Sequence, residues 1–225
     1  FGHTGEYALN SIHPQGFYHS RQSVRIVETL ERGGEGLNLT YEVKDGILKH
    51  SKSYTKIIAD DRQAMPETLE GQIVRVSDSL AYINHDIDDG LQVGILKQHD
   101  LPKELLDILG HTLGERIGCM VRDVITETTR LDLERIAMSA EILEATEALR
   151  KFLFDNFYLT PTINREADKS KRIITELYEY FLDHPEQINL AMFGLQPHAD
   201  LRQIVCDYLA CMTDDVALET YIQVF

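Results

Sequence analysis

A segment between Arg75 and Asp89 has the spacing of an amphipathic helix with reactive groups on one side. At about 100° per residue, its polar side chains form one stripe and its apolar side chains form another on the opposite side. The polar stripe comprises Asp78, Tyr82, His85, Asp86 and Asp89. The apolar stripe comprises Ile73, Val76, Leu80, Ile83 and Ile87. Acids, a phenol and an imidazole on one stripe are the groups that a metal-assisted site for phosphates or sugars uses.

The same pattern is also typical of an ordinary surface helix. Amphipathic helices usually turn their polar side to water and their apolar side to the core. The periodicity alone therefore leaves both interpretations open and favours the solvated helix. A second polar cluster is needed to decide between them.

The first residues of the chain contain several imidazoles and an acid, some of them beside glycine or proline. This group comprises His3, Glu6, His13 and His19. Because glycine allows tight turns, imidazoles from successive turns can converge on one point and titrate there near neutral pH. The alternative is a loop with histidines scattered over the surface.

The elements that must position these residues are mostly helices, because the apolar residues have helical spacing and the strand signals are weak. We expect helices at 20–30, 42–50, 71–96, 112–128, 141–158, 166–183, 200–212 and 214–225, and a further helix that begins at Pro102 and ends near Gly110. The most loop-like part of the first half is 51–70. These elements predict an all-α fold with a boundary near Pro161.

Aromatic residues are frequent in the C-terminal half, at spacings typical of packing. They comprise Phe152, Phe154, Phe157, Tyr158, Tyr178 and Phe181. We interpret them as core residues or contacts between copies of the chain.

Length and composition limit the class of protein. The 225 residues fit one large domain or two small ones, and a hydrophobic content of 43% can fill a core. The sequence has no apolar run of about 18 residues and no secretory signal, which predicts a soluble, cytoplasmic protein without a membrane partner. Three cysteines in such a protein, Cys119, Cys206 and Cys211, are expected to be reduced.

The formal net charge of -15 argues against nucleic acid as the main partner, because the chain repels phosphate backbones at long range. An anionic small substrate would require a bound cation or a local cluster of basic side chains.

Several motifs carry a resemblance to a known family. FGHTGE at 1–6, FYHSRQSVRI at 17–26, LNLT at 37–40 and AYINHDIDD at 81–89 closely resemble the deoxyguanosine triphosphate triphosphohydrolase-like branch of the HD-domain superfamily. DYLACMTD at 207–214 resembles the C-terminal signature of that family. The motifs occur in order, at compatible separations, and cover nearly the whole chain.

The resemblance implies an HD-domain helical fold with additional C-terminal helices. Residues 1–160 would form the phosphohydrolase core, and residues 161–225 would pack on it. In the family, one divalent metal ion (Mg, Mn or another transition metal) is held by a His, a His-Asp pair and a distant Asp. The first three ligands precede the FGH stretch and are absent from the sequence as given, whereas the distant Asp matches Asp78.

The resemblance also implies substrate contacts. The family's sugar-facing tyrosine and sugar-hydroxyl-binding acid match Tyr82 and Asp86, so the polar stripe would face a pocket. His3 and His19 match imidazoles that lie against the phosphates, and Glu6 matches an acid paired with one of them. The remaining candidates, His13 and His85, match no role that can be transferred and are interpreted as structural.

Two departures from the family pattern concern charge. Cys211 and Asp215 stand where relatives often carry Gly and Arg, which puts a phosphate or subunit contact there in doubt. Ser79 stands where some relatives carry Lys, so other cations must meet part of the phosphate charge. The candidates are Arg21, Arg25, Lys44 and Lys49.

The implied activity is metal-dependent hydrolysis of deoxynucleoside triphosphates to deoxynucleosides and inorganic triphosphate. The family also implies a homo-oligomer and a nucleotide as a candidate activator. Two alternatives stay open: an HD phosphohydrolase that acts on another nucleotide, and a nucleotide-binding or regulatory HD module without turnover. The module becomes the better interpretation if the molecule begins at Phe1, because three metal ligands are then lacking.

Overall fold

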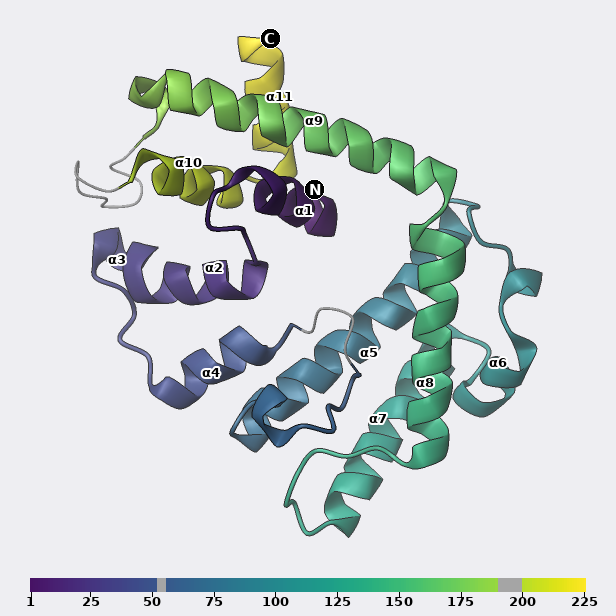
Figure 1. Ribbon diagram of the computed structural model, residues 1–225. Coiled ribbons are helices and arrows are strands. Elements are labelled where there is room, and N and C mark those ends of the chain that lie inside the picture. The colour runs from purple at the N-terminus through teal and green to yellow at the C-terminus, as the bar shows by residue number, and fades with distance from the viewer. Residues whose placement is uncertain (52–55, 190–199) are drawn as a thin grey trace. The chain divides into compact units, whose positions relative to one another are not determined.

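The computed structural model describes residues 1–51, 56–189 and 200–225 (Figure 1). Every regular element in these ranges is a helix, and they contain no β strand, so the predicted all-α fold class is confirmed. No helix found in the same ranges is both long and apolar enough to cross a lipid bilayer.

The chain forms two compact units. Unit 1 contains residues 1–40 and 164–225, and unit 2 contains residues 41–163. The histidine-rich start of the chain therefore packs with the C-terminal helices, whereas the predicted stripe helix belongs to the other unit. The division into a core at 1–160 and a C-terminal region at 161–225 stays a prediction.

Unit 1 combines helices from both ends of the sequence. They are α1 (Gly2–Ile12), α2 (His19–Arg25), α3 (Glu31–Gly34), α9 (Pro161–Asp183), α10 (Leu201–Ala210) and α11 (Asp214–Val224), and α9 belongs to unit 1 from Asn164 onward. A π-helical turn at Ile26–Leu30 follows α2 directly, and a 3₁₀ turn lies at Pro185–Gln187. Apolar side chains from α1, α9 and α10 form one core, in which Ala8, Leu177 and Val205 are inaccessible to water.

Unit 2 is a second helical bundle with its own core. Its helices are α4 (Tyr41–Lys49), α5 (Leu69–Gln92), α6 (Lys103–Leu109), α7 (Leu113–Arg130) and α8 (Ala140–Leu153). Short 3₁₀ turns lie at Arg62–Ala64 and Gln98–Asp100, and a π turn at Phe154–Tyr158 continues α8. The core lies between α5, α7 and α8, where Ile83, Met120 and Leu149 are inaccessible.

Helix α5 has the two-sided character that the sequence predicts. The Thr68 hydroxyl caps its start by accepting a hydrogen bond from the Gly71 N–H, at 3.2 Å. Most of the predicted apolar stripe is buried, namely Val76, Leu80, Ile83 and Ile87. The prediction is wrong for Ile73, which is 37% exposed. Ile73 lies at the rim of the stripe, roughly 50° from its centre at 100° per residue, so it turns away from the core.

The start of the chain is helical, where the sequence predicted tight glycine turns or, as the alternative, a loop. Helix α1 continues through Gly5, where a Cβ would lie 3.0 Å from the Cβ of Phe1, so this glycine serves close packing. The tight turn instead lies between α1 and α2, at Gly16, whose φ of +69° favours glycine.

The remaining expected helices are present with shifted ends. The helix expected at 141–158 changes to a π turn after Leu153, and the helix expected at 71–96 ends at Gln92. Within the loop expected at 51–70, residues 52–55 lie outside the described residues.

Candidate functional site

The sequence-predicted site residues fall into two clusters, one in each unit. Unit 1 holds His3, Glu6 and His19, and unit 2 holds Asp78, Tyr82 and Asp86.

Glu6 and His19 form a pair joined by two hydrogen bonds. Glu6 lies in α1, and His19 is the first residue of α2. The Glu6 carboxylate accepts the His19 backbone N–H on Oε1 at 3.1 Å, and its Oε2 lies 2.7 Å from His19 Nδ1. One carboxylate thus fixes both the start of α2 and the orientation of the imidazole. The side chain of Glu6 is 16% exposed and that of His19 is 39% exposed, so the pair borders solvent.

His3 completes this cluster. The centroids of the His3 and His19 rings are 6.1 Å apart, and their planes are nearly perpendicular, at 80°. Two imidazoles and one carboxylate therefore converge, as the glycine-flanked histidines suggested. They converge from two helices, not from turns of a loop. His13 does not join them. It is buried, and its Nδ1 lies 3.1 Å from the Tyr178 hydroxyl.

The pairing determines the charge of Glu6. Burial alone raises the pKa of the Glu6 carboxyl, but the hydrogen bonds from His19 outweigh it, so the pKa lies below its usual value. Glu6 is therefore ionised near neutral pH and stabilises a proton on the imidazole that it contacts. Because Nδ1 faces Glu6, proton exchange with a ligand would use Nε2.

The lowered pKa of Glu6 predicts a pH-dependent stability. A carboxyl with a lower pKa in the folded state contributes stability above its unfolded pKa, near 4.5, and loses it as pH falls through the folded value. We expect Glu6→Gln to cost about 1 kcal/mol of unfolding free energy at pH 6 and progressively less below pH 4. Urea unfolding of both proteins across this range measures the difference, and a cost that stays constant with pH would contradict it.

The second cluster lies where α5 meets the end of α8. Tyr82 and Asp86 are half-buried and one helical turn apart on α5. The Tyr158 hydroxyl donates a hydrogen bond to the Asp86 carboxylate. The Arg150 guanidinium hydrogen-bonds to the Tyr82 hydroxyl and forms an ion pair with Glu147, at 2.6 Å. Two phenols, two acids and one cation thus lie together where α5 meets the end of α8.

Both phenols stay protonated near neutral pH. Burial raises the pKa of Tyr82, and the nearby Arg150 opposes this only in part. Burial also raises the pKa of Tyr158, as does its hydrogen bond to Asp86. Tyr158 is therefore a hydrogen-bond donor to a charged acid that the sequence places 72 residues away.

Tyr158 is the residue that the sequence interpretation missed. It packs against the core, in agreement with its assignment, but its hydroxyl also contacts Asp86. The π turn places it there, since Phe157 in the same turn fits against Gly90 of α5. A Cβ at Gly90 would lie 3.2 Å from the Phe157 ring. Such turns are frequent at functional sites, but no periodicity in the sequence indicates one.

Asp78 stands apart from these hydrogen-bonded groups. It is exposed on α5, one turn before Tyr82, and the nearby His85 and Asp89 are exposed as well. Its carboxylate is a suitable oxygen ligand for a divalent ion. Within the described ranges, no three His, Cys, Asp or Glu side chains form a group that could hold a metal. Asp78 can therefore supply one metal ligand, but the residues in the described ranges do not form a complete metal site.

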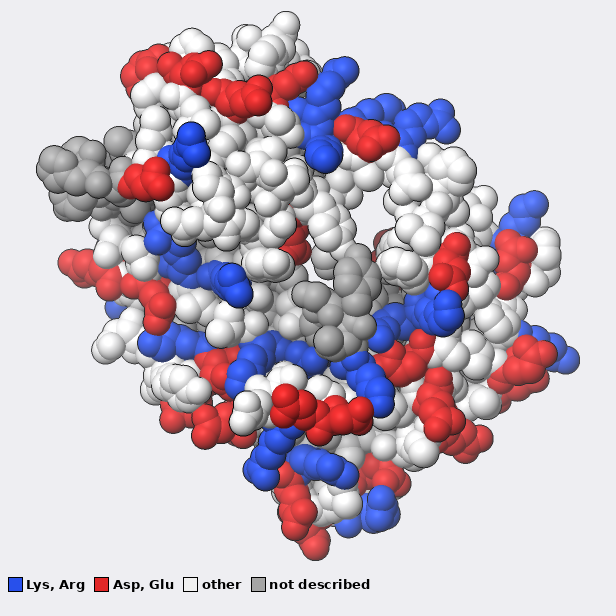
Figure 2. Space-filling view, in the orientation of Figure 1, with Lys and Arg blue, Asp and Glu red and all other residues white. Residues whose placement is uncertain are grey.

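Some of the candidate phosphate-binding cations are engaged elsewhere. Arg25 forms an ion pair with Asp207, and Lys49 forms one with Asp45 at 2.7 Å. The Arg21 guanidinium lies 4.9 Å from the centre of the Tyr18 ring. On the face drawn in Figure 2, basic side chains lie among acidic ones.

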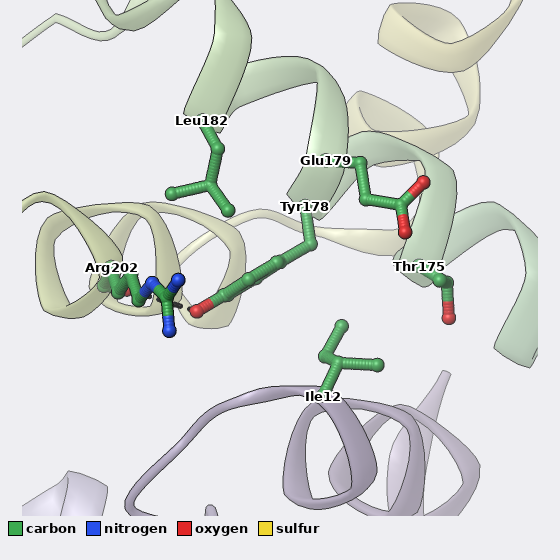
Figure 3. Close-up of a pocket in the computed structure, with 6 residues that line it drawn as sticks. All are labelled: Ile12, Thr175, Tyr178, Glu179, Leu182 and Arg202. Atoms are coloured by element: carbon green, nitrogen blue, oxygen red, sulfur yellow. Dashed lines mark hydrogen bonds between the residues drawn. The ribbon is translucent and has the colours of Figure 1, made fainter.

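Unit 1 also contains a small pocket of about 200 Å³ (Figure 3). It is lined by Ile12, Thr175, Tyr178, Glu179, Leu182 and Arg202. Burial raises the pKa of Tyr178 to about 12, so its hydroxyl is protonated. The lining includes neither Glu6 nor His19, so this pocket is separate from their pair.

Comparison with known proteins agrees with the motifs. Residues 136–223 match a family model described as a phosphohydrolase-associated domain. The whole chain is 46% identical to a deoxyguanosinetriphosphate triphosphohydrolase-like protein of Caldanaerobacter subterraneus subsp. tengcongensis and covers 63% of it. Proteins with the same description from Desulfatibacillum aliphaticivorans and Geobacter sulfurreducens are 39% and 33% identical, and the chain covers 66% and 69% of them.

The chain spans slightly less than two thirds of the length of several of the relatives that it matches. The match nevertheless extends over the entire chain, from the histidine-bearing helices to the C-terminal signature. The chain belongs to the family of deoxyguanosinetriphosphate triphosphohydrolase-like proteins.

Proposed function

We propose that the full-length protein containing this chain hydrolyses deoxynucleoside triphosphates to deoxynucleosides and inorganic triphosphate. The observation that carries the proposal is the Glu6–His19 pair, an oriented imidazole held by an ionised acid at a solvent-accessible position. The family names of the relatives supply the substrate class.

The pair suits the proton transfers of this reaction. Attack of water on the α-phosphorus forms one P–O bond and breaks the bond to the 5′ oxygen, so the water loses a proton and the 5′ oxygen gains one. His19, protonated and stabilised by Glu6, is placed to donate that proton through Nε2. His3, 6.1 Å away between ring centres, adds positive charge beside the phosphates when protonated.

Asp78 would contribute one carboxylate to a divalent metal ion. When bound, such an ion supplies positive charge beside the phosphates. This contribution matters for a chain with a net charge of -15, because the overall field repels an anionic substrate.

The second cluster suits a deoxyribose. Tyr82 offers an aromatic face whose hydroxyl is held by Arg150, and Asp86 can accept a hydrogen bond from the 3′ hydroxyl. The Tyr158 hydroxyl holds the Asp86 carboxylate in place. A rigid phenol beside the sugar would leave little room for a 2′ hydroxyl.

Product analysis tests the proposed reaction. The full-length protein is incubated with each of the four deoxynucleoside triphosphates and a divalent metal salt, and the products are separated by ion-exchange chromatography. Deoxynucleoside and inorganic triphosphate in equal amounts are expected. Pyrophosphate with a monophosphate would indicate a different nucleotide phosphohydrolase, and tight nucleotide binding without products would indicate a module without turnover.

Tyr82→Ala is expected to reduce discrimination against ribonucleotides. Loss of the phenol opens space at the 2′ position, so the ratio of kcat/KM for deoxy- over ribonucleoside triphosphate should fall by about 10-fold or more. Tyr41→Ala is the matched control, because Tyr41 is 62% exposed on α4. Unchanged selectivity in the Tyr82 variant would remove this residue from the sugar site.

A further inference from the structure

Asp207 is a charged residue that is completely buried. It lies in α10, its exposed fraction is 0%, and its carboxylate accepts hydrogen bonds from three side chains. Arg25 approaches with two nitrogens, Nε at 2.8 Å from Oδ1 and Nη2 at 2.6 Å from Oδ2. Gln22 Nε2 donates at 2.8 Å and Gln203 Nε2 donates at 3.0 Å, both to Oδ1.

A buried ion pair is weak support for stability, because desolvation offsets much of its attraction. Such a pair does impose a fixed geometry, since two parallel bonds between a guanidinium and a carboxylate allow little rotation. The hydrogen bonds around Asp207 are therefore better explained by the residues that they hold in place than by a gain in stability.

Two of the three donors belong to α2. Gln22 and Arg25 follow His19 by three and six residues, and α2 has only seven residues before the chain changes to a π turn. A helix this short is marginal without tertiary contacts. Its N-cap residue, Tyr18, makes no capping hydrogen bond with its side chain. The position of α2 therefore depends on Glu6 at its first residue and on Asp207 further along.

We infer that Asp207 is a positioning residue that holds α2 so that the His19 imidazole meets the Glu6 carboxylate. The expected effect on turnover rests on the proposed function. The positioning of α2 by Asp207 does not depend on that function. Glu6 reaches α2 from α1, and Asp207 reaches it from α10, so the helix is held between two carboxylates. Arg25, a sequence candidate for phosphate binding, acts in this arrangement as a structural cation.

The test is Asp207→Asn in the full-length protein. The amide places N–H groups toward Arg25, which breaks the two-bond contact with little change in volume. We expect kcat to fall about 10-fold with KM unchanged within about twofold, since α2 would hold His19 less firmly in place. Asp200→Asn is the matched control on α10, because Asp200 only caps that helix and asparagine caps equally well.

A double-mutant cycle separates positioning from general loss of stability. In a Glu6→Gln background the pair is already disrupted, so Asp207→Asn should cost less than about twofold in kcat. Equal costs in both backgrounds would overturn the inference. If Asp207→Asn fails to fold, the double variant Arg25→Gln with Asp207→Asn replaces the ion pair with two neutral amides. The cost of this double variant is then compared with and without Glu6→Gln.

A measurement without turnover distinguishes failure of this inference from failure of the proposed function. Nuclear magnetic resonance of labelled histidine follows the titration of His19, whose proton is stabilised by Glu6 with His3 nearby. Asp207→Asn should move the His19 midpoint to lower pH, and Asp200→Asn should leave it unchanged. An unmoved midpoint would refute the positioning role, whereas a moved midpoint in a protein without triphosphohydrolase activity would refute only the proposed function.

Discussion

His19→Ala is expected to lower kcat by roughly two to four orders of magnitude, the usual contribution of a positioned acid or base. The imidazole donates the proton in the proposed reaction, and alanine offers neither a proton nor the charge that Glu6 stabilises. Unfolding free energy should fall by no more than about 1 kcal/mol, because the His19 side chain is 39% exposed and the backbone N–H that bonds to Glu6 remains. Steady-state kinetics, with bound metal measured in parallel, checks the expectation.

A matched histidine serves as the control for this variant. His99 is exposed in the 3₁₀ turn of unit 2, with 78% of its side chain accessible, so His99→Ala should leave kcat unchanged. Turnover of His19→Ala close to that of the unmodified protein would show that the imidazole is peripheral. Loss of bound metal together with turnover would assign His19 a role different from proton transfer.

Local patterns in the sequence were sufficient for the helices and their buried sides. The apolar side of α5 follows from a spacing that repeats within one or two turns, and Val76, Ile83 and Ile87 are buried as expected. Ile73 shows the limit of this reasoning, because periodicity gives a direction but not how far the neighbouring helices extend.

Contacts between distant segments could not be read from such patterns. Arg25 and Asp207 are 182 residues apart, and Tyr158 and Asp86 are 72 apart. An arginine near a histidine motif is compatible with phosphate binding or with an ion pair, and only tertiary packing places a buried carboxylate beside it. Tyr158 likewise has the composition of a core residue, and a π turn directs its hydroxyl to the acid.

The convergence of His3, Glu6 and His19 could be predicted from the sequence only in part. The residue types were recognisable, and the resemblance paired Glu6 with a histidine. The expected mechanism of convergence was wrong, because helical turns of α1 and α2 bring the groups together where glycine turns were expected. Gly5 correctly indicated that the groups converge, but it does so by permitting close packing at the start of α1 and not by forming a turn.

Asp78→Asn is expected to abolish tightly bound metal and to lower turnover at least as much as His19→Ala. A neutral amide oxygen is a much weaker ligand for a divalent ion than a carboxylate, because most of the attraction is between opposite charges. The folded chain itself should tolerate the change, since Asp78 is exposed on the polar side of α5. Elemental analysis of the purified full-length protein measures the metal, and kinetics measures the turnover.

Thermal unfolding gives a second readout that does not depend on catalysis. A ligand that binds only the folded state raises the unfolding temperature in proportion to the logarithm of its concentration above Kd. Added Mn²⁺ should therefore stabilise the unmodified protein and leave Asp78→Asn unaffected. Asp89→Asn is the matched control, because Asp89 is exposed on the same side of the same helix and should keep the metal response. Stoichiometric metal in the Asp78 variant would exclude this carboxylate as a ligand. Because Tyr82 and Asp86 follow it on the same face of α5, that result would also weaken the case that this face is turned toward the substrate.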